Sequence, residues 1–373
     1  MWPVGGIRSY MRYTYGYLPA GSYDITVLAA HGAEDDALNI DVEQIGAKLV
    51  FAGEPGKENG PLCQHVFKLL LKESFDLIQS HGFLSACHVA IADIFFKIPH
   101  VFTIHGMFED KFFKSRIESK LKTPLINFLI NRVNVIYSVG EEILDHIESR
   151  LKISEKIERI VIQNGIDIGK FSGSCSDVES SFRWECGIGR EEFVVGFLGR
   201  FMPQKGFNFL IEAVEILKQN DPEIDFKVLA VGSGDYQREY QQQVLMKGLG
   251  EKFVFIPFQR DVSRVYQSLN LLVMPSSWEA FSLLAAEALC MGVPLAASNC
   301  IGLREVTCGT PSLVFKSHDP AALADVIRYA ARHDCTPEFK EFRAEARQRY
   351  DVRKTSQRLH ALFQDILQGQ IDR

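Results

Sequence analysis

The sequence predicts an α/β protein built from two doubly wound, Rossmann-like domains with parallel sheets. Short apolar segments rich in β-branched residues alternate with helical segments along nearly the whole chain, as expected for parallel sheets covered by helices on both faces. At 373 residues the chain is also long for a single core,. Turn-forming and small residues cluster at 164–176, near the middle,. These three observations predict two domains joined close to that cluster.

The two halves contain equal numbers of expected strands. In the first half the strands are expected at residues 24–30, 48–52, 76–80, 100–104, 134–139 and 159–163. In the second half they are expected at 193–198, 226–231, 253–257, 269–274, 294–298 and 312–315. The predicted domains are therefore residues 1–168 and 169–349. A charged, helical tail at 338–367 is expected to pack back across the joint, so that residues 350–373 join the first domain.

The beginning of the chain is unusual for this architecture. Gly5 and Gly6 resemble a strand-to-helix loop and are followed by a helical segment, yet no strand precedes them. The first strand of a doubly wound sheet is central, so its absence should leave a gap beside the ligand crevice. We therefore expect an N-terminal domain that lacks its first strand, because the given start is late or the sheet is organised differently.

Composition excludes several classes of protein. Charged residues make up 24% and hydrophobic residues 46% of the chain, as in soluble globular proteins. A formal net charge of -6 argues against general nucleic-acid binding,. No apolar run is long enough to span a bilayer and no N-terminal signal is evident, so a cytoplasmic protein is expected. The eight cysteines form no C-x-x-C pair and no compact cluster with histidines, which argues against a zinc site or a redox centre. No metal or cofactor is predicted.

The most informative segment is the run from 275 to 294, which contains Glu279 and Glu287. A strand leads into a Pro-Ser turn, and a helix is expected to begin near Phe281 or Ser282. The first N–H groups of such a helix favour an anion such as phosphate. Glu287 would lie roughly 7 Å further along the axis, about the distance from a diphosphate to the ribose of the same nucleotide. Glu279 would face the group attached to the diphosphate.

The alternative interpretation is that both glutamates are solvated surface charges, which is the usual position of this residue. The setting of Glu287 weakens that interpretation, because the surrounding stretch 282–291 is otherwise apolar. A carboxylate there should have a partner.

A second group of candidate residues opens the second half, where a strand is followed by a loop from Gly199 to Gly206. Arg200 and Lys205 in this loop are placed to bond a diphosphate and to balance the charge that grows on it as a leaving group. Exposed loop charges are the alternative. Gly234, in a later Gly-Ser-Gly loop, is placed to line a nucleotide, although a simple turn is the commoner role.

In the first half, His105 ends a strand and is placed to bond a sugar hydroxyl or to transfer a proton; a structural histidine is equally consistent with its spacing. Gly5 and Gly6 would allow a phosphate or sugar close to the backbone, with turn formation as the alternative. Phosphate-loop, nucleophile-elbow, zinc-helix and D-x-D motifs are all absent from the sequence,. A diphosphate would then be neutralised by Arg200, Lys205 and a helix end.

Together these segments resemble the retaining glycosyltransferases of family 4, also called group 1, which have the GT-B fold. The resemblance rests on G-R-F-M-P-Q-K-G, the G-S-G-D loop, the run L-V-M-P-S-S-W-E-A-F-S-L-L-A-A-E-A-L-C-M-G-V-P and N-G-I-D. Looser matches in the first half are P-V-G-G, Q-S-H-G and T-I-H-G. The resemblance covers nearly the whole chain, and its motifs are most specific in the second half.

The resemblance implies a role for each matched residue. Arg200 and Lys205 would hold the donor diphosphate, and Glu287 would bind the ribose hydroxyls. Glu279 would lie by the transferred sugar and diphosphate, together with the backbone of Ala280, Phe281, Ser282 and Leu283. His105 and Gly6 match positions that face the sugar or the acceptor. No metal and no protein nucleophile is implied, so Glu279 is not assigned the nucleophile role of a glycosidase carboxylate.

One departure from the family pattern bears on the donor. The family commonly has E-G-F-G where this chain has E-A-F-S, so Ala280 and Ser282 add bulk near the sugar. This difference is expected to narrow the choice of donor.

The expected function is transfer of a sugar from a nucleoside diphosphate sugar to a hydroxyl of a glycan or lipid-linked acceptor, in biosynthesis of the polysaccharide or lipopolysaccharide type. The nucleoside diphosphate sugar would be a co-substrate rather than a cofactor. Closure of two domains over a central cleft would exclude water. Two alternatives remain, a nucleotide-sugar epimerase of the same fold and an inactive sugar-nucleotide-binding protein. Residues 108–132 mix basic and apolar side chains as an interfacial helix would,, which predicts peripheral contact with the inner face of a membrane; an ordinary crossover helix is the alternative.

Overall fold

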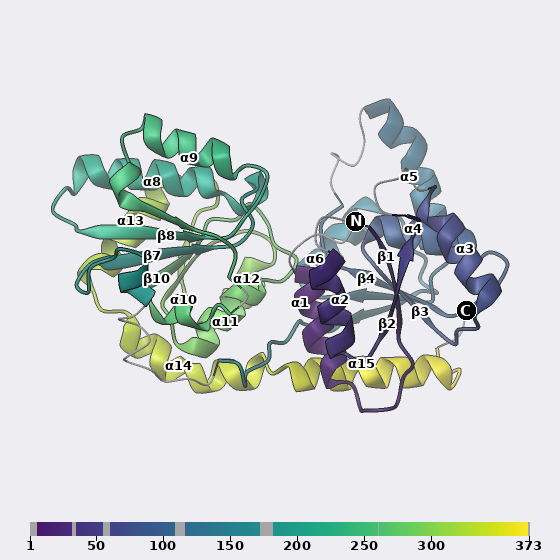
Figure 1. The fold of residues 1–373 in the computed structure, drawn as a ribbon. Coiled ribbons are helices and arrows are strands. Elements are labelled where there is room, and N and C mark those ends of the chain that lie inside the picture. Colours follow the sequence, from purple (N-terminus) through teal and green to yellow (C-terminus); the bar gives the residue numbers. More distant parts are fainter. Residues whose placement is uncertain are drawn as a thin grey trace. The chain divides into compact units, whose positions relative to one another are not determined.

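A computed structural model describes residues 6–31, 35–54, 60–108, 116–171, 182–259 and 261–371, with the side chains of 116–121 excepted. The chain divides into two compact units (Figure 1). Unit 1 comprises Met1–Gly165 and Val352–Arg373, and unit 2 comprises Ile166–Asp351.

Unit 2 contains one parallel sheet of six strands, in the order β12-β11-β10-β7-β8-β9. The strands are β7 (Phe193–Leu198), β8 (Phe226–Val231), β9 (Phe253–Ile256), β10 (Leu271–Met274), β11 (Leu295–Ser298) and β12 (Leu313–Phe315). Their apolar runs are almost continuous because the central strands are buried on both faces,. All six lie within the ranges predicted for them. Four of them are one or two residues shorter than predicted.

Helices cover both faces of this sheet (Figure 1). On one face lie α8 (Phe207–Asn220), α9 (Gln237–Met246) and α13 (Pro320–Arg332), and on the other α10 (Ser263–Gln267), α11 (Leu283–Met291) and α12 (Leu303–Thr307). Apolar side chains of α8, α9 and α13 share one core with the inner sheet residues. The chain therefore leaves β7 and its neighbour β10 toward opposite faces. The loops after these two strands diverge at the carboxyl edge, which is where doubly wound sheets bind ligands.

The described residues of unit 1 also form six parallel strands, but in two sheets. The smaller sheet pairs β1 (Thr26–Ala30) with β2 (Lys48–Ala52). The larger sheet has the order β3 (Ile78–His81), β4 (His100–Ile104), β5 (Val135–Ser138) and β6 (Glu158–Val161). Leu28 of β1 and Ile78 of β3 pack against one apolar cluster contributed by two helices, α3 (Leu62–Lys72) and α4 (Phe83–Ala92).

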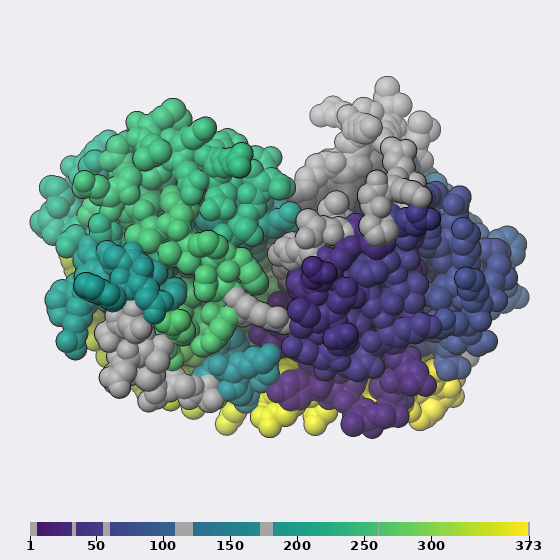
Figure 2. Space-filling view, viewed as in Figure 1, coloured from purple at the N-terminus to yellow at the C-terminus, as the bar shows by residue number. Residues whose placement is uncertain are grey.

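The first described element is a helix, α1 (Gly6–Thr14), which runs into a 3-10 turn, η1 (Tyr15–Tyr17). Within the described residues no strand precedes α1, and residues 1–5, including Gly5, lie outside that range. Further helices of the unit are α2 (Asp35–Gln44), α5 (Arg116–Ile130), α6 (Glu141–Arg150) and, near the end of the chain, α15 (Val352–Leu367). In Figure 2 the N-terminal segments of unit 1 appear in purple and blue, above yellow residues of α15.

The predicted tail consists of two helices, one for each unit. The first, α14 (Thr336–Arg349), belongs to unit 2, and the second, α15 (Val352–Leu367), belongs to unit 1. The start of α15 docks on the segment that follows β6, where Thr355 Oγ1 donates to the Gln163 carbonyl oxygen over 2.9 Å. A Cβ on Gly165 would lie 2.4 Å from the Cα of Val352. The helix therefore packs directly on this backbone.

Of the segment expected to be an interfacial helix, 108–132, residues 109–115 lie outside the described residues, and the rest contains α5. Among the described residues, no helix combines the length and the apolar character needed to cross a bilayer.

Candidate active site

The loops after β7 and β10 meet at the carboxyl edge of the sheet in unit 2. The Ser277 N–H donates to the Gln204 carbonyl oxygen over 2.8 Å, and the Gln204 side-chain amide donates to the Trp278 carbonyl oxygen over 2.9 Å. These reciprocal bonds hold the two loops in register. Lys205 ends a 3-10 turn, η3 (Pro203–Lys205), and is thereby carried to the second loop.

Lys205 and Glu279 form an ion pair across the two loops. The ammonium lies 2.8 Å from Oε1 and 2.9 Å from Oε2 of the carboxylate. Ser276 adds a third donor, with its hydroxyl 2.7 Å from Oε1. Glu279 is only 5% exposed, so its interpretation as a solvated surface charge is wrong. The pair neutralises itself, and an anion entering here would compete with Glu279 for the ammonium.

Arg200 is held much more loosely. Its guanidinium lies 3.8 Å from the carboxylate of Asp235, whose side chain is 89% exposed. An ion pair with such a long distance and such an exposed partner contributes little. Arg200 thus keeps its donors available to a ligand at the same edge of the sheet.

The two predicted glycines nearby lie where backbones approach closely. The Gly199 N–H donates to the Val231 carbonyl oxygen over 3.0 Å. A Cβ on Gly234 would lie 2.4 Å from the Phe201 carbonyl oxygen. Packing of one loop on the other is enough to require a residue without a side chain at Gly234.

Helix α11 begins as predicted, with Ser282 as its N-cap. The Ser282 hydroxyl accepts a 3.3 Å bond from the Ala285 N–H, which satisfies one of the four N–H groups that a helix start leaves without an internal acceptor. Phe281 is buried and its ring contacts Tyr350 with centroids 6.1 Å apart. Ala280 and Leu283 flank this start, so these residues bring backbone rather than polar side chains to the site.

Glu287 lies inside α11 and is 5% exposed. The partner expected for it is Tyr266 of α10, whose hydroxyl donates to Oε2 over 2.9 Å. Tyr266 is itself fully buried, so it presents its hydroxyl in a fixed position. The sequence did not point to Tyr266, because nothing near it in the chain distinguishes it from a core aromatic residue.

In unit 1, His105 is part of a polar cluster. Its Nε2 lies 2.9 Å from Nδ1 of His81, and Nε2 of His81 lies 2.8 Å from the Tyr15 hydroxyl. Desolvation lowers the pKa of His81 to about 3. Desolvation, and then the neighbouring His81, hold the pKa of His105 well below its usual value. Both rings are therefore neutral at neutral pH.

The other residues predicted for unit 1 add less. Gly6 is the exposed first residue of α1, and Gly5 lies outside the described residues. His81 was missed as a candidate, although its position at the end of β3 matches that of His105 just after the adjacent β4. The carboxyl ends of neighbouring parallel strands lie at the same edge, and this signal would have found it.

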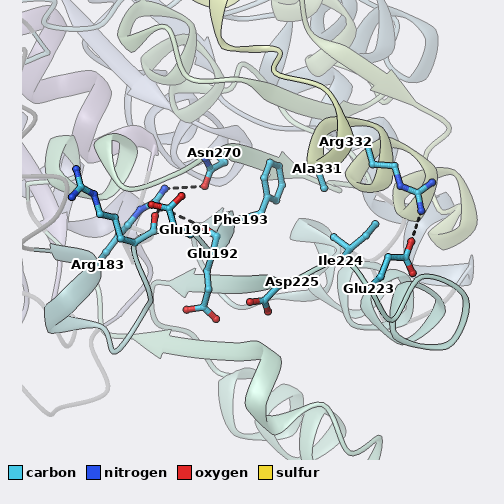
Figure 3. A pocket seen from close by; sticks show the side chains of 11 residues that line it. Arg183, Glu191, Glu192, Phe193, Glu223, Ile224, Asp225, Asn270, Ala331 and Arg332 are labelled. Atoms are coloured by element: carbon cyan, nitrogen blue, oxygen red, sulfur yellow. Dashed lines mark hydrogen bonds and ion pairs between the residues drawn. The ribbon is translucent and has the colours of Figure 1, made fainter.

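A cavity of about 460 Å³ opens at the other edge of the sheet in unit 2, beside the starts of β7 and β8 (Figure 3). It is lined mostly by charged residues, whose ion pairs and hydrogen bonds include Arg332 with Glu223 and Arg183 with Asn270. None of the predicted site residues lines it.

Comparison with known proteins identifies the family. The family model described as glycosyl transferases group 1 matches residues 179–349, and the model described as glycosyltransferase family 4 matches residues 4–170. The chain is a group 1 glycosyltransferase. The first match includes all the candidate site residues of unit 2, and the second includes His105 and His81.

Individual relatives of this group 1 glycosyltransferase differ in what their names say they act on. A D-inositol 3-phosphate glycosyltransferase of Corynebacterium efficiens is 28% identical over 265 residues, covering 68% of this chain and 62% of that protein. A 2-deoxystreptamine glucosyltransferase of Streptomyces kanamyceticus is 28% identical over 289 residues, covering 74% of this chain and 73% of that protein.

Solved structures establish the GT-B fold of the glycosyltransferase. Anabaena Alr3699/HepE in complex with UDP-glucose superimposes with a TM-score of 0.81 at 23% identity, covering 98% of this chain and 97% of that one. WaaG, a glycosyltransferase involved in lipopolysaccharide biosynthesis, gives a TM-score of 0.74 at 16% identity over 99% and 97% of the two chains. The two doubly wound units are those of this fold, as predicted.

The close contact between the loops after β7 and β10 predicts how a glycine substitution changes the free energy of unfolding. Gly206 has a φ of 69°, and an added Cβ would lie 1.9 Å from the Pro275 carbonyl oxygen. Gly309 has a φ of 70° with nothing within 4 Å of such a Cβ. Gly309→Ala should cost about 1 kcal/mol of unfolding free energy, from the left-handed backbone alone. Gly206→Ala should cost about 3 kcal/mol or more, because its methyl group also meets backbone. Urea unfolding measures both, and equal losses would contradict the contact.

Proposed function

We propose that the protein is a retaining glycosyltransferase that moves a sugar from a nucleoside diphosphate sugar to a hydroxyl of a glycan or lipid-linked acceptor, without a metal. Membership of group 1 supports transfer from a nucleotide sugar. The observation that carries the finer proposal is the arrangement at the switch point of unit 2. There Lys205, Arg200 and the start of α11 lie at one edge of the sheet and Glu287 lies further along the same helix, which supports binding of a diphosphate with its attached ribose.

The donor is proposed to be a uridine diphosphate sugar. Structures with this fold contain UDP, UDP with glucose, or UDP-glucose. In this arrangement Glu287 accepts from the ribose hydroxyls while Tyr266 holds its other side. A carboxylate bonded to a buried tyrosine keeps its position when the ligand leaves, so the ribose site is preorganised.

Departure of the diphosphate needs positive charge rather than a protein nucleophile. Lys205 is the nearest source, and it is paired with Glu279 at 2.8 Å. As the negative charge on the diphosphate grows, it competes more strongly for the ammonium. Glu279 is then free to accept a bond from the transferred sugar. Both residues thus act more strongly in the transition state than in the ground state.

The acceptor class is proposed from a surface of unit 1. Among the described side chains, seven large apolar ones are exposed on α3, α4, α5 and the turn after α4: Leu71, Leu84, Ile91, Ile94, Phe95, Leu125 and Phe128. We call this set the α3–α5 surface. Helix α3 contacts α4, and α4 contacts α5. Exposed lysines at 68 and 72, on α3, and at 97, shortly after α4, lie on the same segments. Apolar side chains bordered by lysines fit an anionic lipid surface, which favours a lipid-linked acceptor at the cytoplasmic face of a membrane.

A donor screen tests the central proposal. Incubation with UDP-, GDP- and ADP-sugars should give nucleotide release with a UDP-sugar, undiminished by EDTA, and the glycosidic bond formed should keep the anomeric configuration of the donor. Loss of activity in EDTA would contradict the metal-free mechanism, and inversion would contradict retention. A new nucleotide sugar formed without an acceptor would indicate the epimerase, and tight binding without turnover would indicate the inactive binding protein.

Substitution of Glu287 and substitution of Glu279 should have different effects on UDP binding and on kcat. Glu287→Ala removes the ribose acceptor and should weaken UDP binding about tenfold or more, measured by calorimetry. Glu279→Ala should leave UDP binding nearly unchanged and lower kcat about 100-fold. Glu239→Ala, on the exposed side of α9, is the matched control. The roles assigned here are wrong if Glu279→Ala impairs UDP binding as much as Glu287→Ala does.

Membrane contact is tested on vesicles. The protein should sediment with phosphatidylglycerol vesicles at low salt and not with phosphatidylcholine vesicles. Phe95→Ser with Phe128→Ser should abolish sedimentation, because about 2 kcal/mol of apolar burial is lost with each ring. Trp184→Ser removes an 83% exposed aromatic side chain from unit 2 and should have no effect. Equal sedimentation of all three proteins would exclude the α3–α5 surface as the contact.

A further inference from the structure

The polar cluster around His105 extends through three elements of unit 1. Gln79 and His81 lie on β3, Thr103 on β4 and Tyr15 in η1. The Gln79 amide nitrogen donates to Thr103 Oγ1 over 2.7 Å, and the Tyr15 hydroxyl donates to the Gln79 amide oxygen over 2.6 Å. Thr103 is fully buried and Tyr15 is 8% exposed. The chain of hydrogen bonds thus begins at a rigid, enclosed end.

The direction of each bond determines the next. Because Tyr15 gives its proton to Gln79, its oxygen accepts from Nε2–H of His81, 2.8 Å away. A neutral His81 protonated on Nε2 has a lone pair on Nδ1. That lone pair accepts from Nε2–H of His105 over 2.9 Å. His105 is consequently protonated on Nε2, and its own lone pair is on Nδ1.

The surroundings keep both rings uncharged. Tyr10 of α1 packs edge-on against His105, with centroids 4.8 Å apart, and Tyr137 of β5 packs on Tyr10. The titratable groups that contact the two histidines include Tyr10, Tyr15 and each other, and none of these carries a negative charge that would favour an imidazolium. Desolvation keeps the pKa of both histidines below its ordinary value. His105 itself is partly exposed, and its Nδ1 has no hydrogen-bond partner among the described residues.

We propose that Gln79, Tyr15 and His81 are positioning residues that hold His105 in a single tautomer, so that Nδ1 accepts a hydrogen bond from a sugar hydroxyl. The use of that lone pair rests on the proposed glycosyl transfer; the tautomer does not. His105 in this role orients a hydroxyl without taking its proton. A hydroxyl that donates to Nδ1 turns its oxygen lone pairs away from the ring, toward an electrophile or another donor.

Nitrogen NMR of the histidine-labelled, full-length protein tests the tautomer without a substrate. In the wild type, Nδ1 of His105 should give the signal of an unprotonated nitrogen and Nε2 that of a protonated one, and His81 should show the same pattern. Gln79→Met removes the acceptor of the tyrosine proton, so Tyr15 should donate to His81 and both tautomers should reverse. Tyr15→Phe should give a mixture of tautomers, because it removes the hydroxyl that accepts from Nε2–H of His81.

Thr14→Val is the control, since it removes a buried hydroxyl next to Tyr15 in the chain that has no hydrogen-bond partner among the described residues. Its histidine signals should match those of the wild type. The proposal is overturned if wild-type His105 is protonated on Nδ1, if it is charged at pH 7, or if Gln79→Met leaves the tautomers unchanged. Opposite orientation of the Gln79 amide would produce the first of these results.

Binding and kinetics then locate the hydroxyl. If it belongs to the donor sugar, Gln79→Met should weaken UDP-glucose binding about tenfold in calorimetry while UDP binding is unchanged. If it belongs to the acceptor, UDP-glucose binding should be unchanged and kcat for transfer should fall about tenfold with little change in KM. A reversed tautomer with neither effect would overturn the role in hydroxyl recognition, whereas absence of any UDP-sugar turnover in the wild type would reject only the proposed function.

Discussion

The site in unit 2 depends on one topological constraint, the pairing of β10 with β7. These strands are neighbours in the sheet although more than seventy residues separate them in the chain, and each continues into a helix on the opposite face. Because the two connections diverge, the space above the shared edge cannot be filled by either helix. Lys205 and Glu279 meet there, and the start of α11 is aimed at the same space. The positions of the other candidate residues of unit 2 depend on this pairing of β10 with β7.

Charge balance is the second organising feature. The site already contains an anionic group, because the carboxylate of Glu279 is paired with the ammonium of Lys205. A partly buried cation without a partner would be unfavourable, and the carboxylate of Glu279 compensates the charge of Lys205,. The same carboxylate gives the site a built-in competitor to the ligand. Arg200, by contrast, is only weakly paired, with an exposed carboxylate 3.8 Å away.

Much of the fold could be predicted from local patterns, because buried parallel strands are read from short apolar runs. The twelve expected strands all occur, and α11 begins at its expected serine. The separation of β1 and β2 from the other strands of unit 1 was not predicted in detail, since strand order depends on contacts between distant segments. In the site, the need of Glu287 for a partner was evident, but its identity as Tyr266 was not. Tyr15 and Gln79 are 64 residues apart, and no local pattern joins them.

The arrangement of the two units along the chain has a consequence for how the protein is made. Unit 2 begins at Ile166 and ends at Asp351, and these two residues lie side by side in a parallel bridge. Unit 2 is thus an insertion whose ends meet, within a unit 1 that needs α15 from the far end of the chain. During synthesis the inserted unit is complete before its host. Until α15 emerges from the ribosome, the end of β6 and the backbone at Gly165 lack the helix that covers them, so unit 1 cannot complete its packing before α15 has been synthesised.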